Sequence, residues 1–183
     1  MRKWLKRSIS FFLIPLTRWY LRKSREYNYH GIKIRVLPGV FHPGLFFSTR
    51  VLLTFLSDHE LAGKKLLELG AGSGLISLYA SSKGAEVTAS DISLTALKNI
   101  EYNVERNKLN VTVVKSDLFD QLDLSVYEWI IINPPFYPRD PTTESESAWF
   151  CGKDFGYFTK LFNQLKGKVN HNINVIMVLS EDC

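Results

Sequence analysis

Cysteine is scarce in this sequence, and its scarcity excludes several classes of protein. Only Cys151 and Cys183 occur among 183 residues, and both lie towards the C-terminus. Two cysteines placed in this way build no disulfide-stabilised scaffold and match no zinc-binding spacing. The four histidines are scattered along the chain without a ligand pattern, so we expect no metal site. The default expectation is a reducing, cytoplasmic setting.

Long hydrophobic runs are missing from the basic N-terminal segment. Its longest uncharged stretch covers residues 8–17, far short of the roughly 20 residues that a membrane-spanning helix needs. Arg18, Arg22 and Lys23 follow at once, and no small-residue cleavage site is present. We therefore expect neither a membrane span nor a secretory signal.

Charge is distributed unevenly along the chain. The net charge is +5, but residues 1–26 carry eight basic residues and one acid, which leaves −2 for the remainder. The sequence thus predicts a basic, amphipathic N-terminal arm (1–26), a small hairpin and loop (27–47) and a near-neutral α/β domain (48–183). Three uses of the arm stay open: packing on its own domain, binding nucleic-acid phosphates or, least favoured, resting on a membrane surface.

Strands and helices alternate from residue 64 to the C-terminus, which is typical of a parallel sheet covered by helices. A helix is clearest at 93–107, where apolar residues recur at helical spacing. The apolar runs 130–132 and 175–179 fit strands that are buried on both faces. The expected strands are 65–68, 86–90, 111–115, 129–132 and 175–179.

A glycine-rich turn follows the first of these strands. Gly70, Gly72 and Gly74 follow Glu68 and Leu69 at alternate positions, and glycine lets the backbone pass close to a ligand. The turn lacks the Lys-Ser/Thr pair of a nucleoside triphosphate loop, and plain packing or phosphate binding stay alternatives. Asp91 ends the next strand 17 positions after Gly74, where a carboxylate can accept hydrogen bonds from ribose hydroxyls.

A second acidic position follows the third strand. Asp117 could accept a hydrogen bond from the exocyclic amine of adenine, and Leu118 could offer its backbone amide. The alternative for Asp117 is a helix or turn cap.

The fourth strand is followed by Asn133-Pro134-Pro135-Phe136. An exocyclic amine or amide nitrogen is a poor nucleophile because its lone pair is delocalised. The Asn133 side-chain oxygen and the Pro134 carbonyl can accept its two hydrogens and orient the lone pair. Proline stiffens the loop, and Phe136 can stack on a planar target. The motif thus predicts catalytic roles for Asn133, Pro134 and Phe136, and acceptor contacts from Asn133, Pro135, Phe136 and Tyr137.

These four features, in this order and spacing, resemble the class I S-adenosylmethionine-dependent methyltransferases of the Asn-Pro-Pro-aromatic branch. The resemblance covers residue 39 to the C-terminus. It implies a Rossmann-like α/β fold in which residues 48–183 form the methyltransferase domain, with helices on both faces of a parallel sheet. Counted along the chain, the strands would lie in the order 3-2-1-4-5. The last two strands of the family would be lacking, which leaves an exposed fifth strand through which two copies could associate.

The same resemblance implies S-adenosyl-L-methionine as the cofactor. Its contacts would be Glu68, Gly70, Gly72, Gly74, Asp91, Asp117 and Leu118. It also places Cys151 in a lid or core rather than at a reacting centre.

Two branches of the family suggest different acceptors. Residues 37–41 together with Phe136 resemble the ribosomal RNA guanine-N2 methyltransferases, whereas 41–43 and 152–158 resemble the release-factor glutamine methyltransferases. The basic arm favours RNA or the ribosome as partner, with guanine or adenine in ribosomal RNA as the acceptor, and leaves a protein substrate open. A catalytically inactive cofactor- or RNA-binding module is the alternative from another class.

Overall fold

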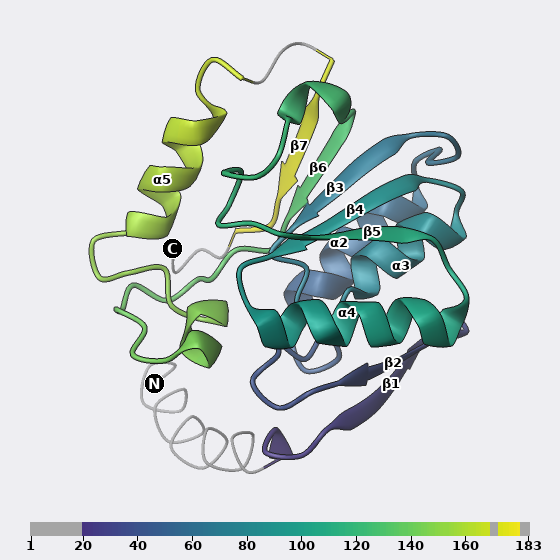
Figure 1. Cartoon of the computed structure of the whole chain (residues 1–183), viewed down its shortest axis with the longest axis horizontal. Helices are drawn as coiled ribbons and strands as arrows, with labels where there is room; N and C mark the ends of the chain where they lie inside the picture. The colour runs from purple at the N-terminus through teal and green to yellow at the C-terminus, as the bar shows by residue number, and fades with distance from the viewer. Residues whose placement is uncertain (1–19, 169–171, 180–183) are drawn as a thin grey trace, which may run out of the picture.

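The computed structural model describes residues 20–168 and 172–179 and contains two sheets. The small sheet is an antiparallel hairpin, and the large one is a parallel five-stranded sheet in the order β5-β4-β3-β6-β7 (Figure 1). This arrangement is the predicted 3-2-1-4-5 order. The strands are β1 (Arg25–Tyr29), β2 (Ile32–Val36), β3 (Lys65–Leu69), β4 (Glu86–Asp91), β5 (Val111–Lys115), β6 (Trp129–Ile132) and β7 (Asn174–Met177).

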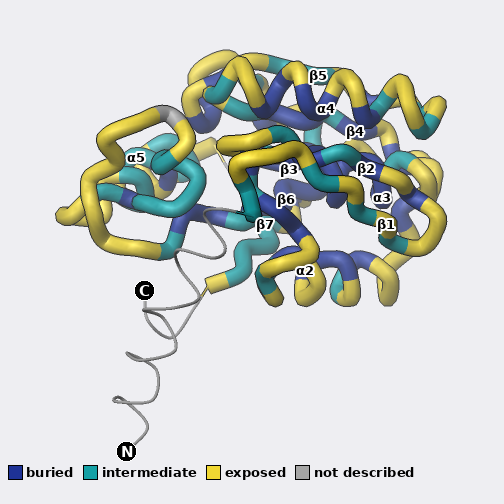
Figure 2. The backbone as a smooth tube through the Cα atoms, turned by 90° about the horizontal axis from the view of Figure 1, so that it is seen from below, coloured by how far each residue is buried: buried dark blue, intermediate teal, exposed yellow. Residues whose placement is uncertain are grey.

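The central strands are apolar because both of their faces are covered. All four residues of β6 are buried, and its tube is dark blue in Figure 2. In β3, Leu66 packs into the cluster on one face of the sheet, and Leu67 packs into the cluster on the other. Strands that are buried on both sides need this continuous apolar pattern, as the sequence predicted.

Helices cover both faces of the large sheet. The helices α2 (Phe47–Ser57), α3 (Leu75–Ser82) and α4 (Leu94–Asn107) contribute to the cluster on one face, and α5 (Gly156–Leu165) contributes to the other. Between β5 and β6 the chain forms a single short 3-10 helix, η1 (Leu124–Val126), and a second one, η2 (Glu144–Ala148), follows β6. The hairpin β1–β2 lies against α4, on the side away from the sheet (Figure 1).

Three details differ from the sequence predictions. The strand β7 ends at Met177 instead of residue 179, although the Val178 amide still donates to the Ile132 carbonyl at 3.2 Å. The helix α2 begins at Phe47, the last residue of the predicted hairpin and loop (27–47), and it has no side-chain cap. Arg25 and Glu26, which we had placed in the basic arm, belong to β1.

Residues 1–19, most of the predicted arm, lie outside the described residues. Within the described residues, no helix is long and apolar enough to cross a membrane. There β7 pairs only with β6, and association of two copies along its other edge stays a prediction.

Candidate functional site

A cavity lies at the carboxyl ends of β3, β4 and β6. Its volume is about 830 Å³ including its open mouth, and it is lined by residues that directly follow these strands, among them Gly70, Ile92 and Asn133. In open parallel sheets, ligands bind at this end, where the strand order reverses. The topology therefore brings together motifs that are far apart in the sequence.

The glycine turn forms one wall of the cavity. Gly70, Gly72 and Gly74 have φ values of 70°, 55° and 77°, a left-handed conformation that favours glycine. Gly70 and Gly72 line the cavity, but Gly74 does not. A Cβ atom on Gly74 would lie 3.2 Å from Ile100, so this glycine allows the start of α3 to pack closely on α4.

Hydrogen bonds within the protein hold the turn in shape. The Ala71 amide donates to the Ser90 carbonyl at 2.9 Å, and the Gly74 amide donates to the Ala71 carbonyl at 2.8 Å. The Gly72 amide donates to Asp91 Oδ2 at 2.9 Å. These three amides already donate hydrogen bonds within the protein. The turn therefore contributes to ligand binding chiefly through a backbone shape that a ligand can approach closely.

Asp91 connects the glycine turn to the start of α4. Its second oxygen, Oδ1, accepts from the Ser93 amide at 2.9 Å, and the residue lines the cavity. A carboxylate oxygen can accept more than one hydrogen bond, so Asp91 keeps capacity for a hydroxyl-bearing ligand. The ribose contact of Asp91 stays a prediction.

Glu68 extends into the same cavity from β3 and is 4% exposed. Its Oε2 atom accepts from the backbone amide of Ser77 at 2.7 Å and from the Ser77 hydroxyl. Burial raises the pKa of Glu68 to about 7; the nearby Asp91 charge adds to this, while the Ser77 hydrogen bonds oppose it. The cavity thus holds a carboxyl group that titrates near neutral pH.

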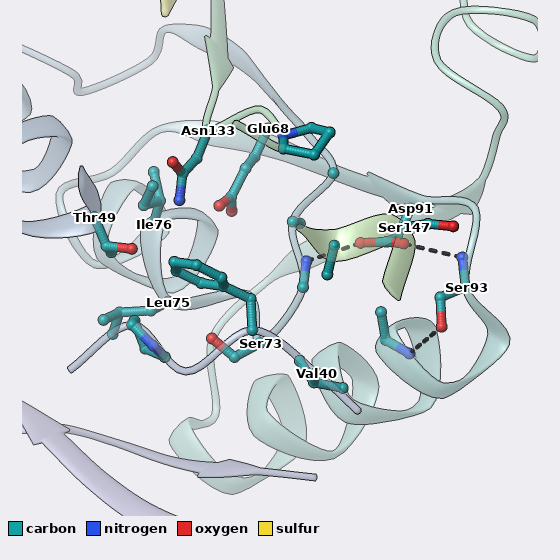
Figure 3. Close-up of a pocket in the computed structure, with 18 of the residues that line it drawn as sticks. Val40, Thr49, Glu68, Ser73, Leu75, Ile76, Asp91, Ser93, Asn133 and Ser147 are labelled. Atoms are coloured by element: carbon teal, nitrogen blue, oxygen red, sulfur yellow. Dashed lines mark hydrogen bonds between the residues drawn. The ribbon is translucent and has the colours of Figure 1, made fainter. Parts of the chain in front are cut away.

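The Asn-Pro-Pro segment forms a second wall. Asn133, Pro134 and Pro135 all line the cavity, and Figure 3 shows the Asn133 amide beside the Glu68 carboxylate. The Asn133 Oδ1 atom is buried and has no hydrogen-bond partner within the protein. A buried acceptor without a partner costs free energy, and this one lies beside an empty volume that an N–H donor could enter.

Besides Gly74, four predicted site residues do not line the cavity. The Asp117 carboxylate forms an ion pair with Lys160 of α5 at 2.7 Å. Leu118 is buried with a φ of 52°, and its carbonyl accepts from the Ser116 hydroxyl. Phe136 is half-buried and Tyr137 is exposed. The adenine contacts and the acceptor contacts assigned to these residues stay predictions.

Two further segments close the cavity, and no cofactor contact had been assigned to either of them from the sequence. Gly39, Val40 and Phe41 line it from the loop after β2, and Ser147 and Ala148 line it from η2. The run Leu-Pro-Gly-Val-Phe was a usable signal, because proline followed by glycine predicts a turn. The structure has this turn after β2, with Gly39 at a φ of 84°.

An aromatic cluster joins these two segments. The ring of Trp149 lies 5.1 Å from Phe41 and 4.7 Å from Phe46, measured between ring centroids. A Cβ atom on Gly39 would lie 3.3 Å from the Ser145 Cβ atom, so the two backbones also approach closely. The cavity is therefore covered by one segment that precedes the glycine turn in the sequence and one that follows the Asn-Pro-Pro motif.

Comparisons with known proteins agree with this geometry. Residues 31–149 match the model of the methyltransferase small domain. A candidate protein N5-glutamine methyltransferase of Methanocaldococcus jannaschii is 35% identical over 129 residues, 68% of this chain and 63% of that protein. Ribosomal RNA small subunit methyltransferase C of Salmonella choleraesuis is 35% identical over 115 residues, 61% of this chain and 33% of that protein.

Solved structures show the same architecture. A 16S rRNA N2 methyltransferase of T. thermophilus, in complex with AdoMet and guanosine, aligns with a TM-score of 0.54 and 28% identity over 63% of this chain and 33% of that one. A SAM-dependent methyltransferase from Agrobacterium tumefaciens shares the fold, with a TM-score of 0.59 and 17% identity. This alignment covers 86% of this chain and 52% of the Agrobacterium chain.

The chain spans about a third of the ribosomal RNA relative and less than two thirds of the M. jannaschii relative. The match of the family model nevertheless extends from the hairpin to the segment after the Asn-Pro-Pro motif, and it includes both walls of the cavity. This chain is a member of the methyltransferase small domain family.

Proposed function

We propose that this chain is the catalytic domain of an S-adenosylmethionine-dependent N-methyltransferase. The cavity fits such a cofactor, because glycines give close approach on one wall and the Asp91 carboxylate faces the same space. When bound, the cofactor supplies an electrophilic methyl group on a sulfonium. Gly70, Gly72 and Asp91 would hold it, and the turn's internal hydrogen bonds fix their positions before it binds.

The buried, unpartnered Oδ1 atom of Asn133 carries the proposal. An amine or amide hydrogen on the acceptor would satisfy this atom, and the adjacent Pro134 carbonyl provides a second acceptor in the same loop. Holding both hydrogens orients the nitrogen lone pair towards the cavity. Pro134 and Pro135 are buried, so the loop is set before the acceptor arrives.

The acceptor proposed is an exocyclic amine of guanine or adenine in ribosomal RNA. The T. thermophilus structure, which is 28% identical to this chain, was solved with guanosine, and the S. choleraesuis relative is named for ribosomal RNA. The +7 charge of residues 1–26 would support binding to a polyanion. The proposal places the protein in the cytoplasm with RNA or the ribosome as partner.

The side-chain amide of a protein glutamine is the second candidate acceptor. The M. jannaschii relative, named for this activity, matches 68% of the chain, a larger share than the S. choleraesuis relative matches. A primary amide also presents two hydrogens on a planar nitrogen, so the same two acceptors fit it.

Two measurements test the proposal in sequence. Calorimetry with S-adenosylhomocysteine should show binding to the unaltered chain, and no binding would contradict the cofactor assignment. Labelled S-adenosylmethionine should then transfer its methyl group to total RNA, with digestion identifying an N-methylated base. Transfer to ribosomal or release-factor protein fractions instead would favour the glutamine candidate. Binding without transfer to either would favour an inactive module.

A further inference from the structure

Three asparagines follow one line along α4 and face the hairpin. They are spaced four residues apart, so they advance about 6 Å per step along the helix axis. Alternate residues of a strand advance by nearly the same distance, about 6.6–6.8 Å. Successive asparagines can therefore bind successive alternate residues of β2 and of the segment that follows it. The three asparagines are Asn99, Asn103 and Asn107.

The asparagine side chains bind the hairpin as a neighbouring strand would. The Lys33 amide donates to Asn107 Oδ1 at 3.0 Å. The Arg35 amide donates to Asn103 Oδ1 and the Leu37 amide to Asn99 Oδ1, both at 2.8 Å. In return, Asn107 donates to the Lys33 carbonyl at 2.9 Å. Both Asn99 and Asn103 donate to the Arg35 carbonyl, at 2.6 and 2.9 Å. This asparagine ladder covers the edge of β2 that β1 leaves free.

The middle asparagine also reaches the glycine turn. Asn103 Nδ2 donates its second hydrogen to the Ser73 carbonyl at 2.9 Å, so both of its amide hydrogens are used. Asn103 is fully buried, and Ser73 lines the cavity between two glycines of the turn. One side chain thus joins the hairpin to a wall of the cavity.

The hairpin itself leads into another part of the cavity wall. Three residues after the last rung at Leu37, the Val40 amide donates back to the Leu37 carbonyl at 3.1 Å, which turns the chain into the cavity. Gly39, Val40 and Phe41 then line it. Docking of the hairpin on α4 therefore fixes two parts of the cavity: this segment directly, and the glycine turn through Asn103.

We propose that Asn103 is a positioning residue that couples docking of the hairpin to cofactor binding. The inference rests on the proposed function, because it assigns the cavity to the cofactor. If a docked hairpin is required to form the binding site, cofactor binding must in turn hold the hairpin on α4. Asn103 is then part of the binding machinery and not only a support of the fold, whereas Asn107 supports the hairpin alone.

The first test compares three variants by calorimetry with S-adenosylhomocysteine, each well below its melting temperature. Asn103→Ala should weaken binding about tenfold or more, within the range of ordinary coupling between sites. Asn107→Ala removes a rung of the same ladder that makes no bond to Ser73. Leu161→Ala lowers stability on the other face of the sheet. Both controls should stay within about twofold of the unaltered protein.

The outcomes separate the coupling from the proposed function. If the unaltered protein does not bind S-adenosylhomocysteine, the proposed function fails and the variants are not needed. If it binds and Asn103→Ala binds equally well, the coupling is wrong. Equal weakening by Leu161→Ala would also overturn it, because general loss of stability would then explain the effect.

Hydrogen exchange of the unaltered protein provides a second test that needs no variant to fold. With S-adenosylhomocysteine at 100 times its dissociation constant, opening of the hairpin should slow about 100-fold if binding requires docking. The amides of Arg35 and Leu37 report that opening, and those of α5 serve as a control. Unchanged exchange at Arg35 and Leu37, or equal slowing in α5, would overturn the proposal.

Discussion

Replacing Glu68 by glutamine should change how the stability of the protein depends on pH. Glu68 is 4% exposed, and its carboxylate has Ser77 as its hydrogen-bonding partner while Asp91 lies near enough to repel it. Glutamine has nearly the same shape, keeps an oxygen that can accept from Ser77 and carries no charge at any pH. The variant therefore removes the titration with little change in packing.

The magnitude follows from the pKa of Glu68 in the two states. Its ordinary value is 4.5, which we take for the unfolded chain, and burial raises it to about 7 in the fold. Below pH 4.5 the group is neutral in both states. Between pH 4.5 and 7 only the unfolded chain loses its proton, so stability falls as pH rises. At 1.36 kcal/mol per pKa unit, the full loss above pH 7 is about 3 kcal/mol.

Urea denaturation across this pH range provides the assay. The difference in unfolding free energy between Glu68→Gln and the unaltered protein should shift in favour of the variant by about 3 kcal/mol from the acidic to the alkaline end. Glu105→Gln, on the exposed side of α4, is the matched control and should show no such shift. A pH-independent difference for Glu68→Gln would refute the reasoning.

Two further predictions concern the walls of the cavity. Asp91→Ala should weaken binding of S-adenosylhomocysteine by about 1.5–3 kcal/mol, since a carboxylate acceptor is lost, and calorimetry showing unchanged affinity would contradict this role. Trp149→Ala removes ring contacts to Phe41 and Phe46 and should lower the free energy of unfolding by about 1–3 kcal/mol. Thermal unfolding measures the change, and Trp149→Phe should retain most of the stability of the unaltered protein. If Trp149→Ala were as stable as the unaltered protein, the aromatic cluster would not stabilise the segments that cover the cavity.

Local patterns in the sequence were sufficient for the sheet and for two walls of the cavity. The run Ile130 to Ile132 predicted a strand buried on both faces, and the turn at Gly70 and Gly72 marked the end of the first strand. Both inferences depend on residues that are neighbours in the chain. Parallel topology then placed Asn133 and Asp91 at the same edge of the sheet.

Features that depend on distant segments could not be read in this way. Asn103 is one of several polar residues on α4, and only the fold shows that β2 passes it and that Ser73 lies on its other side. The ion pair of Asp117 with Lys160 of α5 joins residues that are far apart in the sequence, and no local pattern predicts it. Similarly, Trp149 and Phe41 are separated by more than half of the sequence, and no periodicity in it predicts that their rings are in contact.

The central claim is that Asn133 holds the nitrogen that receives the methyl group. The direct test measures two properties of Asn133→Ala, its rate of methyl transfer and its affinity for S-adenosylhomocysteine, and compares both with the unaltered protein. We expect transfer to fall by about 100-fold or more, as loss of orientation would cause, while affinity changes little. Asn133→Asp keeps an acceptor at the same position and should retain part of the activity. Full turnover by Asn133→Ala would contradict the mechanism.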